Sequence, residues 1–310
     1  MKCDIKRLQG YLPIVALSIL SSATADVLAQ QTTNQPAPAV RPQQPPLTVQ
    51  KVKGDIYQVK GGAGANAGFV VGEEEVFVID AKMTDESARQ MLQEIAKISP
   101  LPVKKVLLTH SDGDHVNGLT GFPPTVDVIS HENTRTHVAG AFRADNQRRY
   151  VPNVSFTENL RISRGTDSAS GRIEMLYFGP AHTDGDVIVH FPAEKVAFAG
   201  DLIFLGRDPL IHRTKNGTSF GLMKVLKSIL ALDVDLILSG HNDPITKDSI
   251  RTFITSVEER QEKVAAMVKS GKSLEEVKAA FQIDTQPAGQ GARRWPSLVE
   301  VIYLELTQKK

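Results

Sequence analysis

The stretch VKKVLLTHSDGDHVNG, from Val103 to Gly118, shows most clearly how this chain folds and where its chemistry lies. Its apolar first part, ending at Leu108, predicts a buried β-strand. Four side chains able to bind a metal ion follow directly: His110, Asp112, Asp114 and His115. Gly113 allows the backbone to bend, so that all four can converge on one pocket at the end of the strand. The stretch therefore predicts a metal site rather than a solvated polar loop.

Three more potential ligands each follow a predicted strand and a nearby glycine: His182, Asp201 and His241. Each alone is weak evidence, because a histidine at a strand end is often only a hydrogen-bonded surface group. Their order and spacing together indicate a site for two metal ions, since strand ends can hold ligands at fixed distances.

The surrounding sequence alternates between short apolar runs and helical patterns. The expected strands are residues 56–59, 68–71, 75–79, 103–108, 126–129, 172–178, 187–191, 196–199 and 236–238. Thr84 is expected to cap a helix that Pro100 ends. Apolar spacing then predicts a helix from Ile250 until Gly271, and Ser273 with Glu276 predicts the start of another. These patterns predict an α/β domain over residues 49–250, with helices from residues 251–310 packed on the same domain.

The N-terminal residues resemble an export signal. Three basic residues precede an apolar run from Tyr11 to Leu20, and Ala23-Thr24-Ala25 is typical of a cleavage site. Residues 1–25 are therefore expected to be a signal peptide, and residues 26–48, rich in proline and glutamine, a flexible tether. We expect a periplasmic or secreted protein with no stable membrane insertion after the signal is removed, because the apolar run is too short to span a bilayer.

The charge balance also narrows the function. The chain carries 36 basic and 35 acidic residues, for a formal net charge of +1. This balance gives no electrostatic signature of a nucleic-acid-binding protein. A small molecule is the expected substrate.

The ligand pattern resembles the metallo-β-lactamase superfamily, whose motif is His-x-His-x-Asp-His followed by a His, an Asp and a final His. The similarity covers roughly residues 49–250, and Val78-Ile79-Asp80 resembles the family's strand that ends in Asp. It implies a four-layer αββα sandwich of two mixed β-sheets flanked by helices. It also implies that His110 and His182 bind the first metal, that Asp114, His115 and His241 bind the second, and that Asp201 bridges them.

Asp112 departs from this pattern, because it stands where the family has its second histidine. Three interpretations remain open: Asp112 is a ligand, the first metal is weakly bound or absent, or the site is degenerate. Two divalent ions are expected, with zinc favoured. Iron or manganese remain alternatives, because a carboxylate ligand shifts metal preference toward ions that favour oxygen.

The resemblance indicates an exported, metal-dependent hydrolase in which a metal-bound hydroxide cleaves an ester, lactone, thioester or amide bond, including that of a β-lactam. Asp114 is expected to orient the nucleophile and transfer its proton, and Asn117 is a candidate oxyanion donor. His212, with Arg207 and Arg213, is a further candidate for contact with an anionic substrate.

Two other classes of function remain open. One is a di-iron redox enzyme, since flavin-linked relatives of this fold carry a glutamate at the position of Asp112. The residues after Ile250 are too few for the flavodoxin domain of those relatives. The other is a non-catalytic metal-binding scaffold, against which the otherwise complete ligand set argues.

Overall fold

The structure, a computed structural model, describes residues 45–165, 171–283 and 295–308 of the 310-residue chain. The predicted signal peptide (residues 1–25) and residues 26–44 of the predicted tether lie outside the described residues. The first strand takes in Thr48, the last residue that the sequence analysis assigned to the tether.

The strands form two mixed sheets. The first sheet has the order β1-β2-β3-β4-β5-β6-β7, and its last four strands run parallel. The second has the order β12-β11-β10-β9-β8, with β11 and β12 parallel. The first sheet comprises β1 (Thr48–Lys53), β2 (Ile56–Lys60), β3 (Ala67–Val71), β4 (Val76–Ile79), β5 (Val103–Leu107), β6 (Asp127–His131) and β7 (Val154–Phe156). The second comprises β8 (Asn159–Ser163), β9 (Arg172–Leu176), β10 (Ile188–Phe191), β11 (Val196–Phe198) and β12 (Leu236–Leu238).

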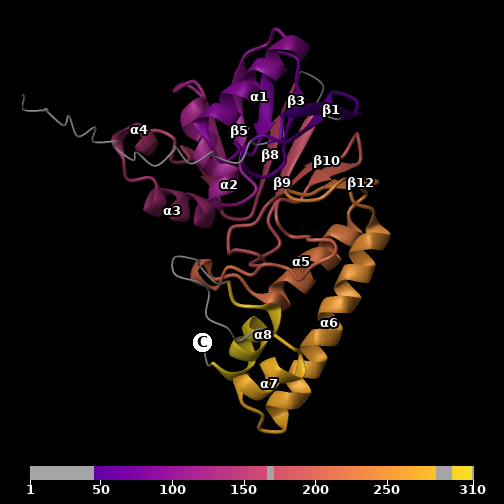
Figure 1. Cartoon of the computed structure of the whole chain (residues 1–310). Coiled ribbons are helices and arrows are strands. Elements are labelled where there is room, and N and C mark those ends of the chain that lie inside the picture. Colours follow the sequence, from indigo (N-terminus) through magenta and orange to yellow (C-terminus); the bar gives the residue numbers. More distant parts are fainter. Residues whose placement is uncertain (1–44, 166–170, 284–294, 309–310) are drawn as a thin grey trace, which may run out of the picture. The chain divides into compact units, whose positions relative to one another are not determined.

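Helices cover the outer faces of both sheets. Those that follow strands of the first sheet are α1 (Asp85–Ile98), α2 (Gly113–Val116), the 3-10 helix η1 (Asn117–Gly121), α3 (Glu132–Ala141) and α4 (Asp145–Arg148). The later ones are η2 (Arg213–Lys215), α5 (Ser219–Ala231), α6 (Lys247–Lys269), α7 (Leu274–Ala280) and α8 (Leu298–Thr307). In Figure 1 the earlier helices, in indigo to magenta, and the later ones, in orange to yellow, gather on different sides of the strands.

The four layers enclose three apolar cores. Alternate side chains of β4 belong to two of them. Val76 and Val78 face the core shared with α1, whereas Phe77 and Ile79 face the core between the two sheets. Successive side chains of a strand point to opposite faces, so a strand covered on both faces is apolar throughout. The third core joins the second sheet to α5, α6 and α8. The expected αββα sandwich of two mixed sheets is confirmed.

Local signals place several helix ends as the sequence predicted. The Oγ1 atom of Thr84 accepts a hydrogen bond from the amide of Ser87 at the start of α1. Ser273 and Glu276 form the expected capping box of α7. Strands β1, β7 and β8 and helices α5 and α8 were not predicted from the sequence. His131 ends β6, and its Nδ1 accepts from the amide of Asn133 to cap α3.

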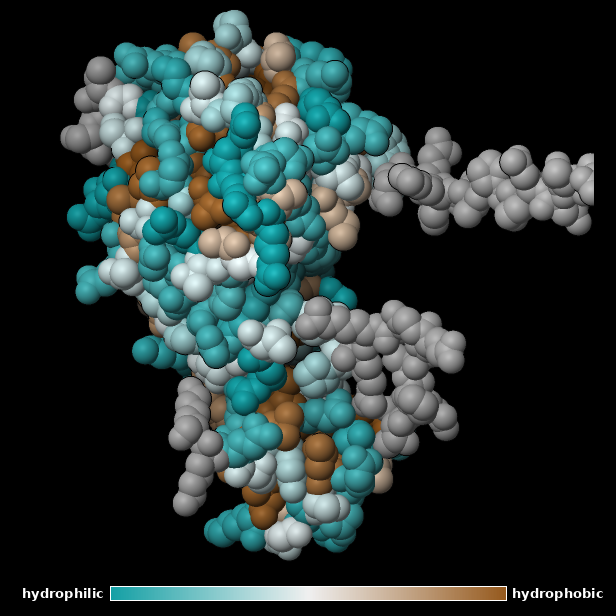
Figure 2. Space-filling view, turned by 90° about the vertical axis from the view of Figure 1, so that its left-hand side faces the viewer, coloured by the Kyte–Doolittle hydropathy of each residue, from teal (hydrophilic) through white to brown (hydrophobic). Residues whose placement is uncertain are grey.

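The described surface gives no sign of a membrane-spanning element. No helix among residues 45–165, 171–283 and 295–308 is long and apolar enough to cross a bilayer. On the face drawn in Figure 2, apolar side chains reach the surface in separate patches among polar ones. Scattered exposed apolar residues are normal for a folded protein in water.

Candidate metal centre

The candidate ligands lie where the strands of both sheets end. His110 follows β5, Asp201 follows β11 and His241 follows β12. Asp112 precedes the short helix α2, whose first turn carries Asp114 and His115. Parallel neighbouring strands end at the same edge of a sheet, and here the edges of both sheets deliver ligands to one place. The structure brings all seven predicted metal ligands together.

Within this centre the ligand atoms form two groups. One consists of His110, Asp112 and His182, and the other of Asp114, His115, Asp201 and His241. Inside each group all ligand atoms lie within 4.8 Å of one another, as the donors around one metal ion must. The grouping divides Asp114 and the four histidines as the family resemblance implied. It also places Asp112, whose role was left open, in the first group, and Asp201, the expected bridge, in the second.

Asp201 lies between the two groups. Its Oδ1 is 3.1 Å from Nε2 of His115, and its Oδ2 is 3.0 Å from Nε2 of His241. The same Oδ2 lies 3.9 Å from Nε2 of His110, a member of the other group. Asp114 completes the second group, with its Oδ2 3.2 Å from Nε2 of His241. A carboxylate in this position suits a bridge between two cations.

Three of the histidines are held by Nδ1 and present Nε2 to the centre. Nδ1 of His115 donates to Asp80 at 2.7 Å, and Nδ1 of His182 donates to the Leu210 carbonyl at 2.7 Å. Nδ1 of His110 lies 3.0 Å from the hydroxyl of Thr109, which itself donates to Asp80. Such contacts fix the tautomer and the ring orientation of a metal-binding histidine.

Buried atoms without partners show that these residues fit divalent ions. Nε2 of His110, Nε2 of His115 and Oδ1 of Asp201 are buried and lack a hydrogen-bond partner. His115 and Asp201 are close, but their contact does not have hydrogen-bond geometry. Buried polar atoms are normally satisfied, so imidazole and carboxylate atoms that lack a partner and face one another are suited to hold a cation.

The charges of the centre shift its pKa values in the metal-free protein. Hydrogen bonds with Asp114 and Asp201 raise the pKa of His241 to about 9. Burial lowers the pKa of His182, but Asp112 outweighs it and the pKa rises to about 9. Burial would raise the pKa of Asp201, yet the neighbouring histidines hold it well below its usual value. Burial likewise lowers the pKa of His115, but Asp201 and Asp80 outweigh it and hold that pKa well above its usual value. The carboxylates are therefore ionised, and three histidines carry protons that a metal ion would displace.

Glycines allow the close approach of the strand ends. A Cβ atom at Gly240 would lie 2.2 Å from Oδ1 of Asp201 and 2.8 Å from Cε1 of His115. Gly200 has a φ of +51°, and a Cβ there would lie 2.6 Å from the hydroxyl of Thr109. Any side chain at these positions would displace a ligand or its support.

The residues that the sequence suggested for oxyanion stabilisation and substrate contact lie outside the two groups of ligand atoms. Asn117 is exposed and lies outside both ligand groups. Its side chain packs against Gly113, where an added Cβ would lie only 2.7 Å from its Nδ2. His212 is buried and faces Asp112, and Arg213 pairs with Glu305 at 3.5 Å. From the sequence both residues were candidates for substrate contact, whereas the structure buries His212 against Asp112 and pairs the half-buried Arg213 with Glu305.

Two residues near Asp112 were not recognised as part of the centre from the sequence. Nε2 of His212 lies 2.8 Å from Oδ2 of Asp112, and Nζ of Lys215 lies 2.7 Å from its Oδ1. From the sequence His212 was a candidate for substrate contact and not for the metal centre, and a single lysine in a loop carries no motif. Their contacts with Asp112 join residues about a hundred positions apart and depend on the fold alone.

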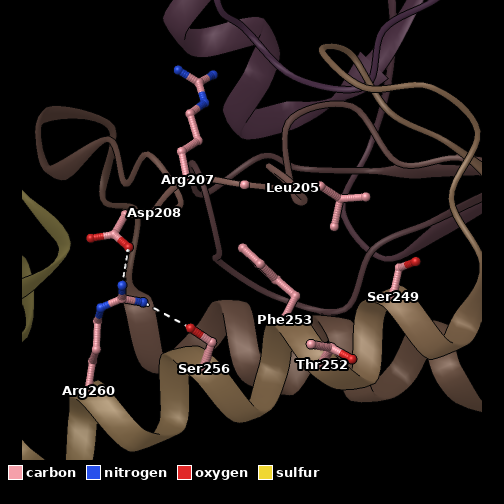
Figure 3. Close-up of a pocket in the computed structure, with 9 residues that line it drawn as sticks. Leu205, Arg207, Asp208, Ser249, Thr252, Phe253, Ser256 and Arg260 are labelled. Atoms are coloured by element: carbon pink, nitrogen blue, oxygen red, sulfur yellow. Dashed lines mark hydrogen bonds and ion pairs between the residues drawn. The ribbon is translucent and has the colours of Figure 1, made fainter.

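A separate cavity of about 430 Å³ lies between the loop after Asp201 and α6. Leu205 and Phe253 point toward it, and the ion pair of Asp208 with Arg260, 3.0 Å apart, closes one end (Figure 3). Arg207 points away from it and stacks over Phe204, which packs against the ring of His241. No metal-ligand candidate lines this cavity.

The comparisons with known proteins point to one family. Residues 61–241 match the model of the metallo-beta-lactamase superfamily. A 2,4-dinitroanisole O-demethylase subunit alpha of Nocardioides sp. is 27% identical over 64% of this chain, and the chain spans 58% of its length. A hydroxyacylglutathione hydrolase of Cereibacter sphaeroides is 31% identical, covering 61% of this chain and 70% of that protein.

Further relatives agree in sequence and in fold. A type 2 metallo-beta-lactamase of Elizabethkingia meningoseptica is 26% identical over 72% of this chain and 89% of its own length. The structure of a metallo-beta-lactamase from Pontibacter korlensis superposes with a TM-score of 0.57 at 18% identity, covering 68% of this chain and 99% of that one. The family match covers more than half of the chain, and its relatives include metal-dependent hydrolases. The chain therefore belongs to the metallo-β-lactamase superfamily.

Proposed function

We propose that this chain is an exported hydrolase that cleaves an ester, lactone, thioester or amide bond of a small molecule with the help of two divalent metal ions. The observation that carries the proposal is the pair of ligand groups that meet at Asp201. A β-lactam and a thioester are both within this range, and both kinds of hydrolase occur among the relatives by name.

The residues have distinct roles in this proposal. Two divalent ions held by these residues would supply an ionised water at neutral pH and would polarise the oxygen of the scissile bond. The carboxylate of Asp201 would offset the repulsion between the two cations. Asp114, which is less buried than Asp201, holds the attacking water through its free oxygen and passes the proton on to the leaving group.

Zinc is the metal we propose, with iron or manganese as the alternative that Asp112 raises. Imidazole nitrogen predominates among the donors and suits zinc, whereas a third carboxylate favours metals that prefer oxygen. Metal analysis of the purified protein, with an ultraviolet-visible spectrum, separates a colourless zinc hydrolase from a coloured di-iron redox enzyme.

Activity is tested on the metal-loaded protein with lactone, ester, thioester and β-lactam substrates. Asp201→Ala should lose metal and nearly all hydrolysis while keeping its circular dichroism spectrum. Asp208→Ala, a change of the same residue type outside the ligand groups, should keep both metal and activity. A fully metallated and active Asp201→Ala protein contradicts the bridge, and a metal-loaded wild type that hydrolyses none of the substrates contradicts the proposed function.

Export is a separate part of the proposal. It is supported by the signal-like residues 1–25. If cleavage follows Ala25, the mature protein begins at Asp26, and the intact mass of protein from the periplasm or the medium should show this. A mass that includes Cys3 in that fraction contradicts the proposal.

A further inference from the structure

We propose that His212 and Lys215 are positioning residues of the first metal site, which together make up for the histidine that Asp112 replaces. His212 orients the carboxylate of Asp112 toward the metal, and Lys215 offsets its additional negative charge. The proposal rests on the two-metal site proposed above and on no particular substrate.

The contacts of Asp112 divide between its two oxygens. Oδ1 accepts a hydrogen bond from Nζ of Lys215 at 2.7 Å, and Lys215 also donates to the carbonyl of Ser111 at 3.0 Å. Oδ2 lies 2.8 Å from Nε2 of His212 and 3.1 Å from Nε2 of His182. It is also the oxygen nearest to His110, at 3.9 Å from Nε2. One oxygen is therefore held by the protein, and the other faces the nitrogens of the first site.

His212 differs from the ligand histidines in a way that suits a supporting role. Its Nε2 does not join the group of ligand atoms that lie within 4.8 Å of one another, although Asp112 and His182 both do. Its contact with Oδ2 leaves a further lone pair of that oxygen for a metal ion. Carboxylate ligands are commonly held in this way by a hydrogen-bond donor behind them.

Backbone contacts fix His212 and Lys215 relative to His182. The amide of His212 donates to the carbonyl of His182 at 2.8 Å, and the amide of Asp184 donates to the carbonyl of Lys215 at 2.9 Å. A Cβ at Gly217 would lie only 2.2 Å from the carbonyl oxygen of His182, so the two loops are packed tightly. This double attachment makes the positions of both side chains part of the fold rather than of a free loop.

The positive charge of Lys215 offsets the extra carboxylate that Asp112 adds to the ligands of the first site. A cluster of two divalent ions with three aspartates carries one positive charge less than a cluster with two. Lys215 restores that charge at the oxygen that does not face the ligands. The side chains of Asp112 and Lys215 are only 12% and 21% exposed, so solvent screens this pair incompletely.

The first test removes the imidazole of His212. The metal-free protein is titrated with Zn²⁺ against a competing chelator, and Co²⁺ quenching of Trp295 follows the first site. Trp295 is the only tryptophan of the chain, and its ring lies 4.2 Å from that of His212. We expect His212→Ala to weaken one of the two sites by about 10- to 100-fold and His212→Gln to recover most of the loss, because glutamine keeps a donor.

His190→Ala is the matched control. His190 is as buried as His212 and also contacts a carboxylate, Glu174 at 3.1 Å, but it lies in β10, away from the ligands. It should leave both zinc affinities unchanged. Unchanged affinities in His212→Ala, or a glutamine variant as weak as the alanine variant, overturn the positioning role. A wild-type protein that binds no divalent ion overturns both this inference and the proposed function.

The second test restores the family histidine. Asp112→His alone leaves the Lys215 charge beside the first metal without its carboxylate, so zinc affinity at that site should not rise. Adding Lys215→Met should raise it at least about 10-fold over the single variant, which corresponds to about 1.4 kcal/mol. Lys227→Met, which breaks a surface pair with Glu258, should add nothing. Equal affinities with and without Lys215 overturn the compensation.

Discussion

At the scale of single residues, the centre depends on which imidazole nitrogen is left free. Asp80, Thr109 and the Leu210 carbonyl each engage the Nδ1 atom of one histidine, so Nε2 is the atom that faces the ligands. None of these three partners is a metal ligand itself. Replacing the side chain of Asp80 or Thr109 is therefore expected to disturb the metal site by reorienting rings rather than by removing donors.

Metal binding should depend on pH in a direction set by three histidines. In the metal-free protein His182 and His241 have pKa values of about 9, and the pKa of His115 is raised well above its usual value, so all three carry a proton at pH 7 that the metal must displace. Apparent zinc affinity should rise between pH 7 and 9, by up to about tenfold per pH unit for each proton. Calorimetry in buffers of different ionisation enthalpy should count about three protons released at pH 7.

The same pKa values predict how the metal-free protein responds to base. For a histidine whose pKa is raised on folding, the stabilisation is complete below the unfolded value of about 6.5 and is lost as the pH rises through about 9. The melting temperature of the metal-free protein should therefore fall across this range more than that of the metal-loaded protein. An equal fall in both, or no proton release at pH 7, contradicts the assignment of protonated histidines.

At the scale of elements, the strand ends and the glycines beside them decide how closely the ligands approach one another.

The sequence patterns placed most strands correctly to within two residues, because strands buried on both faces appear as short apolar runs. The spacing of apolar residues did not reveal helices α5 and α8. Nor did it show that Gly113 is followed at once by a helical turn, which carries Asp114 and His115 into one ligand group.

Gly240→Ala tests the close approach after β12. The added methyl group would overlap Oδ1 of Asp201 and the ring of His115, so we expect the second metal to be lost or weakened by at least about tenfold, with the fold retained. Gly140→Ala in α3 is the control, since nothing lies within 4 Å of its Cβ position. It should leave metal binding unchanged and increase stability by up to about 1 kcal/mol. Metal content and thermal melts measure both effects, and a Gly240→Ala protein with two tightly bound metals contradicts the packing argument.

At the scale of the molecule, the C-terminal helices share an apolar core with the second sheet. One apolar core contains Ile188 of β10, Ala197 of β11, Leu226 of α5 and Ile302 of α8. Its residues come from within the family match, which ends at residue 241, and from the chain that follows it. A shared core makes separate unfolding of the C-terminal helices unfavourable.

Ile302→Ala should therefore destabilise the whole unit. Removing this fully buried side chain is expected to cost about 2–5 kcal/mol while unfolding remains a single transition. Leu306→Ala in the same helix, where the side chain is 40% exposed, should change the free energy of unfolding by less than about 0.5 kcal/mol. Denaturant unfolding followed by circular dichroism gives both values. A second, separate transition in either protein would show that α8 unfolds independently.

The sequence by itself determined the two-sheet α/β architecture and the identity of the residues that the structure gathers as potential ligands. Both follow from local information: apolar periodicity forms strands, and metal-competent side chains recur where those strands end. Only the tertiary structure decided which atoms face each other. The contacts of Asp112 with His212 and Lys215 join residues about a hundred positions apart through the packing of two loops, and no local pattern encodes such a distance.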